Sequence, residues 1–144
     1  MSLRPARGAA DPATVPRMQT ETAEIEIAAS PEDVWAVAGD FGGIGWMPGL
    51  ESVEVNGDRR TIVTSGMTIV ERLVAGDEDA RTLTYGIVEG PVPVESHEAT
   101  IAVVPAGDGS RVSWSVTAEP DDAAAFMRDV YAGALKALKA KIED

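Results

Sequence analysis

The chain has 144 residues, a length that fits one domain with a sizeable core. It has no cysteine, which excludes disulfides, thiolate metal sites and cysteine nucleophiles, and its only histidine, His97, excludes metal sites that need two imidazoles. Its 24 acidic and 12 basic residues give a formal net charge of −12, which repels nucleic acid and anionic membrane surfaces. No stretch approaches the roughly 18 apolar residues that span a bilayer. We expect a cytoplasmic, single-domain protein with no nucleic-acid partner and no membrane insertion.

The first residues differ in composition from the rest of the chain. Residues 1–20 hold three of the nine prolines and four charged residues, Arg4, Arg7, Arg17 and Asp11, for a net charge of +2. They show little apolar periodicity, and they lack the apolar run of a secretory signal. This composition predicts a disordered tail over residues 1–19 and a folded domain over residues 20–144. Met1 and Met18 both stand as candidate start residues.

Patterned sequence begins with a strand and a short helix. Apolar side chains at every second position predict a half-exposed strand over Thr22–Ala28. Ser30 is a favoured N-cap and Pro31 suits the first helical position, so a helix is expected to begin there and to stop at Gly39. The next segment, residues 41–49, is too rich in glycine for a long helix. It predicts a loop or one short helical turn that presents large apolar side chains.

Strand-like runs then follow at close spacing, separated by turn residues such as Asn56-Gly57 and Ser65-Gly66. Such turns favour hairpins between consecutive antiparallel strands. With the first strand the sheet would have seven strands. The six later runs are Leu50–Val55, Arg60–Thr64, Met67–Val74, Arg81–Glu89, Val94–Val104 and Arg111–Ala118.

The last element is a long amphipathic helix from Pro120 to the end of the chain. Acidic residues at its start and lysines near its end complement the helix dipole. One face is apolar at helical spacing, and it carries Ala123, Met127, Val130, Tyr131, Ala134, Leu135, Leu138 and Ile142.

Strand parity assigns side chains to the two faces of the sheet, because alternate residues point in opposite directions. Only the fourth strand is ambiguous, since both of its faces hold a charge. Placing Arg72 outside, where its long stem reaches solvent, puts Glu71 inside. The expected inner sets are Ile69, Glu71 and Leu73; Leu83, Tyr85 and Ile87; His97, Ala99, Ile101 and Val103; and Val112, Trp114 and Val116.

Several stretches, in their order along the chain, resemble the START-like, or SRPBCC, superfamily, and within it the small bacterial polyketide cyclase/dehydrase group. The first are Ser30-Pro31-Glu32-Asp33-Val34-Trp35 and Gly39-Asp40-Phe41-Gly42-Gly43 followed by Trp46-Met47-Pro48. The resemblance covers about residues 20–142. Further matching stretches are Glu71-Arg72-Leu73, Gly90-Pro91-Val92-Pro93-Val94, Gly107-Asp108-Gly109-Ser110 and Trp114.

The resemblance implies an α+β helix-grip fold, in which a seven-stranded, curved antiparallel sheet wraps around the long C-terminal helix. It also implies a hydrophobic cavity between sheet and helix. Members of the superfamily bind lipids, sterols, polyketides or other apolar ligands, and some catalyse cyclase or dehydratase chemistry. Relatives often carry a His where this chain has Met47. The substitution removes a polar group from the cavity mouth, which weakens an enzymatic interpretation.

Three inner-face polar residues are the candidate chemical groups. Burial would raise the pKa of Glu71, and His97 could share a proton with it, so the pair could act as base and acid while Tyr85 donates to a developing oxyanion. The alternative, which we favour, is that Glu71 and His97 satisfy each other, or bridge to Arg60, as polar groups that orient a ligand.

The remaining candidates are apolar or aromatic. Trp46 and Met47 are expected either to gate the cavity mouth or to cap the core. Trp114 is expected in the cavity wall, and Met127 and Tyr131 on the buried helix face, where the Tyr131 hydroxyl is a candidate ligand contact. No nucleophile elbow, phosphate loop, dinucleotide fingerprint or calcium loop occurs, so we expect neither a metal nor a cofactor.

Three functions remain open. The leading hypothesis is a protein that binds a small hydrophobic molecule such as a lipid, polyketide or aromatic metabolite. The second is a polyketide cyclase/dehydratase-type enzyme that uses Glu71, His97 and Tyr85. The third is an interaction domain whose interior is filled by its own side chains.

Overall fold

The computed structural model describes residues 19–91 and 96–144. These residues form seven strands and two helices, in the order that the sequence predicts. The predicted tail covers residues 1–19, of which residues 1–18 lie outside the described residues, as do residues 94–95 of a predicted strand. The elements are β1 (Gln19–Ile27), α1 (Pro31–Ala38), β2 (Leu50–Asn56), β3 (Arg59–Thr64), β4 (Met67–Asp77), β5 (Thr82–Glu89), β6 (Ser96–Ala106), β7 (Gly109–Glu119) and α2 (Asp121–Glu143).

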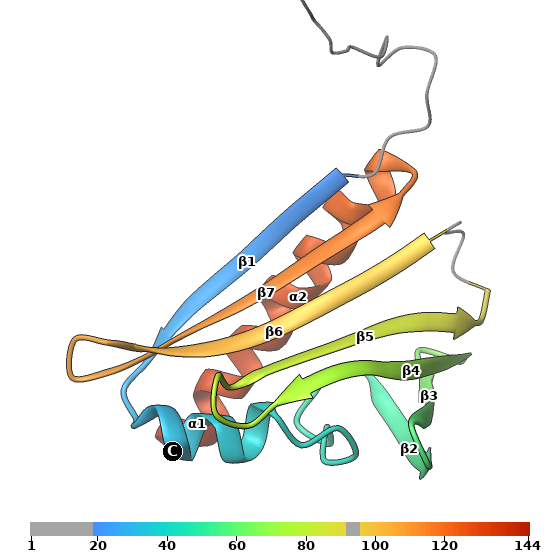
Figure 1. Cartoon of the computed structure of the whole chain (residues 1–144). Coiled ribbons are helices and arrows are strands. Elements are labelled where there is room, and N and C mark those ends of the chain that lie inside the picture. Colours follow the sequence, from blue (N-terminus) through green and yellow to red (C-terminus); the bar gives the residue numbers. More distant parts are fainter. Residues whose placement is uncertain (1–18, 92–95) are drawn as a thin grey trace, which may run out of the picture.

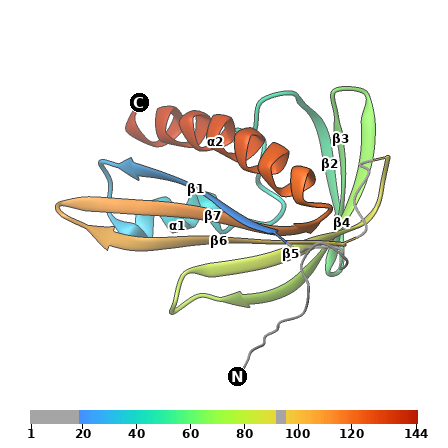
Figure 2. The ribbon, with the colours of Figure 1, turned by 90° about the horizontal axis from the view of Figure 1, so that it is seen from above.

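All seven strands belong to one antiparallel sheet of order β1-β7-β6-β5-β4-β3-β2 (Figure 1). Strands β2 to β7 follow one another as hairpins, and β1 pairs with β7 at the other edge of the sheet. This pairing extends β1 three residues before its predicted start, because residues 19–21 also pair with β7. Helix α2 lies across one face of the sheet and packs mainly on β1 and β7 (Figure 2). The fold is therefore the predicted α+β helix-grip fold.

Irregular pairing bends the sheet on the side of β2 to β4. The register shifts twice in the pairing of β4 with β5, between Val70 and Glu71 and between Leu73 and Ala75. A further shift separates Leu50 from Ser52 in β2. Bulges of this kind bend strands and increase their twist. As a result, β2 and β3 rise beside the N-terminal half of α2 (Figure 2).

Helix α1 begins and ends as predicted. The Ser30 hydroxyl accepts the Asp33 backbone N–H at 3.2 Å, and Pro31 occupies the first turn. Gly39 ends the helix at a crowded position, where a Cβ atom would lie 2.5 Å from the Trp35 ring. Trp35 is partly buried against the core, and its indole N–H donates to the carboxylate of the exposed Glu78.

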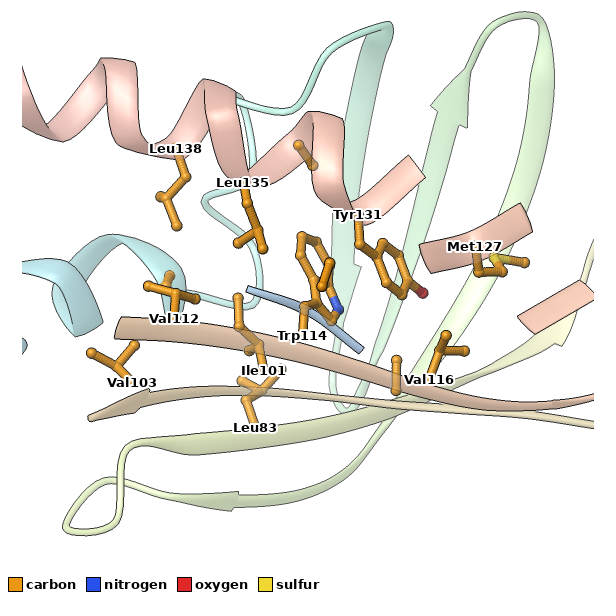
Figure 3. Packing of buried hydrophobic residues seen from close by; sticks show 14 of the residues in the cluster. Leu83, Ile101, Val103, Val112, Trp114, Val116, Met127, Tyr131, Leu135 and Leu138 are labelled. Carbon is orange, nitrogen blue, oxygen red and sulfur yellow. The ribbon is translucent and has the colours of Figure 1, made fainter. Parts of the chain in front are cut away.

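The apolar core lies between the C-terminal half of α2, helix α1 and strands β6 and β7 (Figure 3). Leu135 and Leu138 point from α2 toward Val103 and Val112 of the sheet, and Val34 contributes from α1. Each of these side chains is at most 1% exposed. Burying an aliphatic side chain this completely stabilises a fold by about 1.5–3 kcal/mol.

Burial confirms the predicted inner faces of the sheet. Glu71, Tyr85, His97 and Trp114 are all at most 8% exposed, whereas Arg72 is exposed. The predicted helix stripe differs at one position: Val130 is 45% exposed. Val130 lines the cavity described below instead of packing in the core, so its position on the apolar helix face does not bury it.

We expect Leu138→Ala to lower the free energy of unfolding by about 2–5 kcal/mol, since the core must lose apolar contacts and keep a void. The exposed neighbour Lys136 provides the control, and Lys136→Ala should change stability by less than about 0.5 kcal/mol. Urea denaturation of the two variants measures both values. Equal losses would contradict the placement of the core.

Candidate ligand-binding site

A cavity of about 280 Å³ lies between β3, β4 and β5 and the N-terminal half of α2. Most of its wall is apolar, with a smaller set of polar residues. The polar lining residues are Arg60, Thr64, Ser65, Glu71, Tyr85 and Tyr131. The apolar ones are Met47, Pro48, Leu50, Ile62, Met67, Ile69, Ile87, Phe126, Met127 and Val130.

The lining residues differ in exposure, which distinguishes an inner end from a mouth. Met67, Val130 and Phe126 line the cavity and are 38%, 45% and 63% exposed. Tyr85 and Tyr131 line it too, but they are only 2% and 5% exposed. The mouth is therefore an exposed apolar rim, and the aromatic hydroxyls lie at the inner end.

A buried ion pair forms part of the inner wall. Arg60 of β3 and Glu71 of β4 lie directly opposite each other in the sheet. Both the Nε and Nη2 groups of Arg60 contact the same carboxylate oxygen, Oε1 of Glu71, at 2.8 Å. The Arg60 Nη1 group donates to the Phe41 carbonyl at 2.7 Å. Removing either partner would leave a buried charge without compensation.

Two aromatic rings hold the Arg60 guanidinium in place. Its central carbon lies 4.3 Å from the centre of the Phe41 ring and 4.7 Å from that of Tyr85, both within the range of cation–π attraction. Burial raises the pKa of the Glu71 carboxyl above its ordinary value, and the Arg60 guanidinium opposes that rise.

A hydrogen-bonded chain of side chains lies behind and beside this pair. The Trp114 indole N–H donates to the Tyr85 hydroxyl at 3.1 Å, and the Tyr85 O–H donates to the Tyr131 hydroxyl at 3.3 Å. Nε2 of His97 lies 3.1 Å from the same Tyr131 hydroxyl. The Trp114 and Tyr131 rings also stack, with centres 4.1 Å apart and planes at 1° (Figure 3).

Both ring nitrogens of His97 are engaged. The Ile87 backbone N–H, which can only donate, points at Nδ1 over 3.2 Å. Nδ1 is therefore the acceptor of a neutral ring, and Nε2 carries the proton that His97 donates to Tyr131. Burial lowers the pKa of His97 to about 4, so the ring stays neutral at pH 7. No lone pair of His97 is left to take a proton from a bound molecule.

The predicted site residues divide into two groups. Met47, Glu71, Tyr85, Met127 and Tyr131 line the cavity.

The other three are not in the cavity lining, and they act on it through neighbours. His97 and Trp114 hold the tyrosine hydroxyls. Trp46 lies in the segment between α1 and β2, packs on Trp114 with ring centres 6.3 Å apart, and borders a separate space of only about 20 Å³. Its indole nitrogen is buried and has no hydrogen-bond partner among the described residues.

The model of a protein family described as polyketide cyclase / dehydrase and lipid transport matches residues 18–143 of the chain. The chain belongs to this family. Two similar solved structures are XoxI from Bacillus cereus, with 33% identity and a TM-score of 0.82, and an uncharacterised protein from Bacillus thuringiensis, with 31% identity and a TM-score of 0.81. These matches cover 88% of this chain and 97% and 100% of the other two.

A protein from Thermobifida fusca is also similar, with 29% identity, a TM-score of 0.73, and coverage of 85% of this chain and 92% of that one. No curated protein matches the chain.

In this family member, residues 19–91 and 96–144 contain no group of three side chains suited to hold a metal ion. None of its described helices combines the length and apolarity needed to cross a membrane.

The sequence predicts Arg60 only as an alternative partner of Glu71. It places Val130 on the buried helix face and does not predict that Phe126 and Val130 form an apolar rim at the mouth. Phe126 and Val130 lie four residues apart on α2, beside the lining residues Met127 and Tyr131. Phe126, an apolar residue next to the predicted stripe but outside it, was the available signal. A helix whose apolar face is wider than its core contact has apolar surface left for a cavity.

Replacing Arg60 of the buried ion pair should lower the free energy of unfolding. We expect Arg60→Met to lower stability by about 3–5 kcal/mol at neutral pH, since Glu71 then stays buried without a cation. A carboxyl with a raised pKa stabilises the fold while protonated and loses this contribution as pH rises, so the deficit should shrink at acidic pH.

The double variant Arg60→Met, Glu71→Leu is the matched comparison. It replaces both charges by apolar groups and should recover most of the lost stability. Urea denaturation across pH measures all three proteins. A double variant no more stable than Arg60→Met would show that the buried charge is not the cause.

The lowered pKa of His97 predicts acid sensitivity. Neutral His97 makes its full contribution to the free energy of unfolding above pH 6.5, the pKa of the unfolded state. This contribution is lost as pH falls toward the folded-state pKa of about 4, a loss of up to about 3 kcal/mol. His97→Gln keeps one acceptor and one donor but does not titrate. The stability difference between wild type and this variant should therefore decline over that pH range, and a constant difference would be inconsistent with a neutral, buried His97.

Proposed function

We propose that this protein binds a small hydrophobic molecule in the cavity between its sheet and α2. The observation that carries this proposal is the cavity itself: about 280 Å³, mostly apolar walls and a few convergent polar groups at the inner end. Ligand sites typically combine these features, and their volumes run from roughly 300 to 1,000 Å³. Membership of a family described by polyketide chemistry and lipid transport agrees with such a ligand.

The volume limits the size of the ligand. A cavity of about 150 Å³ suffices for benzene. At about 280 Å³ the present cavity has room for roughly twice that, which suits a bicyclic aromatic metabolite or an aliphatic group of similar bulk. A larger lipid or polyketide would have to leave part of its length outside, along the rim formed by Met67, Phe126 and Val130.

The exposed rim supports entry from solution. Large apolar side chains on a protein surface usually mark an interaction or binding site when they lie together. Here the exposed side chains of Phe126 and Val130 continue into the cavity wall, so an apolar ligand would meet them first.

The formal net charge of −12 argues against nucleic acid as the partner. The cytoplasmic location and bacterial source expected from the sequence remain predictions.

The geometry supports binding more than acid–base catalysis of the cyclase or dehydratase type. The second hypothesis needs a proton carrier in contact with the ligand. His97 has both ring nitrogens engaged, and the Oε1 atom of Glu71 is held by Arg60. Glu71 remains the candidate base of that hypothesis, because it lines the cavity and burial raises its pKa.

A bulky substitution in the wall tests the proposal. Ile87→Trp should fill the cavity and weaken binding of a neutral fluorescent probe, N-phenyl-1-naphthylamine, at least tenfold. Val88→Trp is the matched control, since Val88 is the next residue of β5 but is 43% exposed and does not line the cavity. Fluorescence titration gives both dissociation constants. Equal affinities for the two variants, or no binding to wild type, would contradict the proposal.

A further inference from the structure

One donor in the hydrogen-bonded chain behind the cavity has no assigned acceptor. The Trp114 N–H, the Tyr85 O–H and the His97 Nε2–H each have an assigned acceptor within the chain. The two chain ends are fixed, because an indole N–H can only donate and His97 Nδ1 is taken by a backbone N–H. The bond between the two tyrosines runs from the Tyr85 O–H to the Tyr131 oxygen.

The surplus donor is the Tyr131 hydroxyl. Its oxygen accepts from Tyr85 and from His97, which uses the acceptor capacity of a phenolic oxygen. Its own proton must then point elsewhere, and no described residue accepts it. Tyr131 is 5% exposed and lines the cavity, so the remaining direction leads to the inner end of that cavity. Burial also raises the pKa of Tyr131 well above its ordinary value, so the proton stays in place.

The charges of the wall are balanced. Among the described residues that line the cavity, only Arg60 and Glu71 carry charge, and they are paired at 2.8 Å. A ligand carboxylate would therefore give up its hydration without gaining an unpaired cation, which is costly in an apolar site. An uncharged oxygen loses less, and a hydrogen bond from Tyr131 compensates that loss.

We propose that the cavity selects neutral ligands that place a carbonyl oxygen at its inner end, where Tyr131 donates a hydrogen bond to it, and that it discriminates against carboxylates. The inference rests on the proposed function and adds the chemical class of the ligand. The rings of Trp114 and Tyr131 stack in contact, so the donor is held in one orientation before a ligand arrives. Preorganisation of this kind favours binding because little freedom is lost.

Three naphthalenes of similar shape test the inference by calorimetric titration at pH 7. These are 2-acetylnaphthalene, which carries a carbonyl, 2-isopropylnaphthalene, which has no acceptor, and 2-naphthoate, which is a carboxylate. Wild type should bind the acetyl compound about 3- to 10-fold more tightly than the isopropyl compound, the range of one net hydrogen bond. It should bind the carboxylate most weakly.

Tyr131→Phe should abolish the preference for the carbonyl and leave the affinity for 2-isopropylnaphthalene within about twofold, which also shows that the cavity is intact. This variant leaves the buried donors of Tyr85 and His97 without acceptors, so it should be less stable than wild type. Infrared spectroscopy of wild type with carbonyl-labelled 2-acetylnaphthalene needs no variant. The bound C=O stretch should lie below its frequency in an apolar solvent.

The results distinguish a failure of the proposed selectivity from a failure of ligand binding itself. Equal affinity for the acetyl and isopropyl compounds, tighter binding of 2-naphthoate, or an unshifted C=O stretch would overturn the proposed selectivity while ligand binding still stands. Binding of none of the three compounds to wild type would overturn both the inference and the proposed function on which it rests.

Discussion

The stacking of Tyr131 on Trp114 divides the interior of this protein into two parts. On one side, Leu135 and Leu138 of α2 fill the space over the sheet with close-packed side chains (Figure 3). On the other side, Met127 lies in the wall of the cavity. The two rings lie 4.1 Å apart and almost parallel, and hydrogen bonds to Tyr85 and His97 fix their edges. The core thus supplies a rigid inner wall for the site.

The cavity follows from the same architecture. Helix α2 packs mainly on β1 and β7, whereas the bent side of the sheet, β2 to β4, rises beside its N-terminal half. One helix cannot cover the whole concave face of such a sheet. The uncovered part keeps an apolar wall, and its two charged residues, Arg60 and Glu71, are paired at 2.8 Å.

Much of the fold could be predicted from the sequence, because strand alternation and hairpin turns are local signals. Strand alternation placed Tyr85 and His97 on the inner face, and the long stem of Arg72 decided the face of Glu71. The pairing of Arg60 with Glu71 was also accessible in principle: Ser65 and Gly66 both have positive φ, so the two-residue turn fixes the hairpin register and sets these residues opposite each other. The contact of Tyr131 with His97 was not accessible, since it depends on how α2 crosses the sheet. Helical spacing likewise could not show that Val130 faces a cavity instead of the core.

Nuclear magnetic resonance of the methyl groups in the cavity wall shows whether an apolar molecule enters this cavity. Intermolecular Overhauser effects from 2-isopropylnaphthalene should reach the methyl groups of Ile62, Ile69 and Ile87, which line the cavity. They should be absent at Ile27 and Ile101, which are buried in the core. Effects confined to exposed residues outside the cavity, or no effect at any of the three lining isoleucines, would show that the molecule does not enter the cavity.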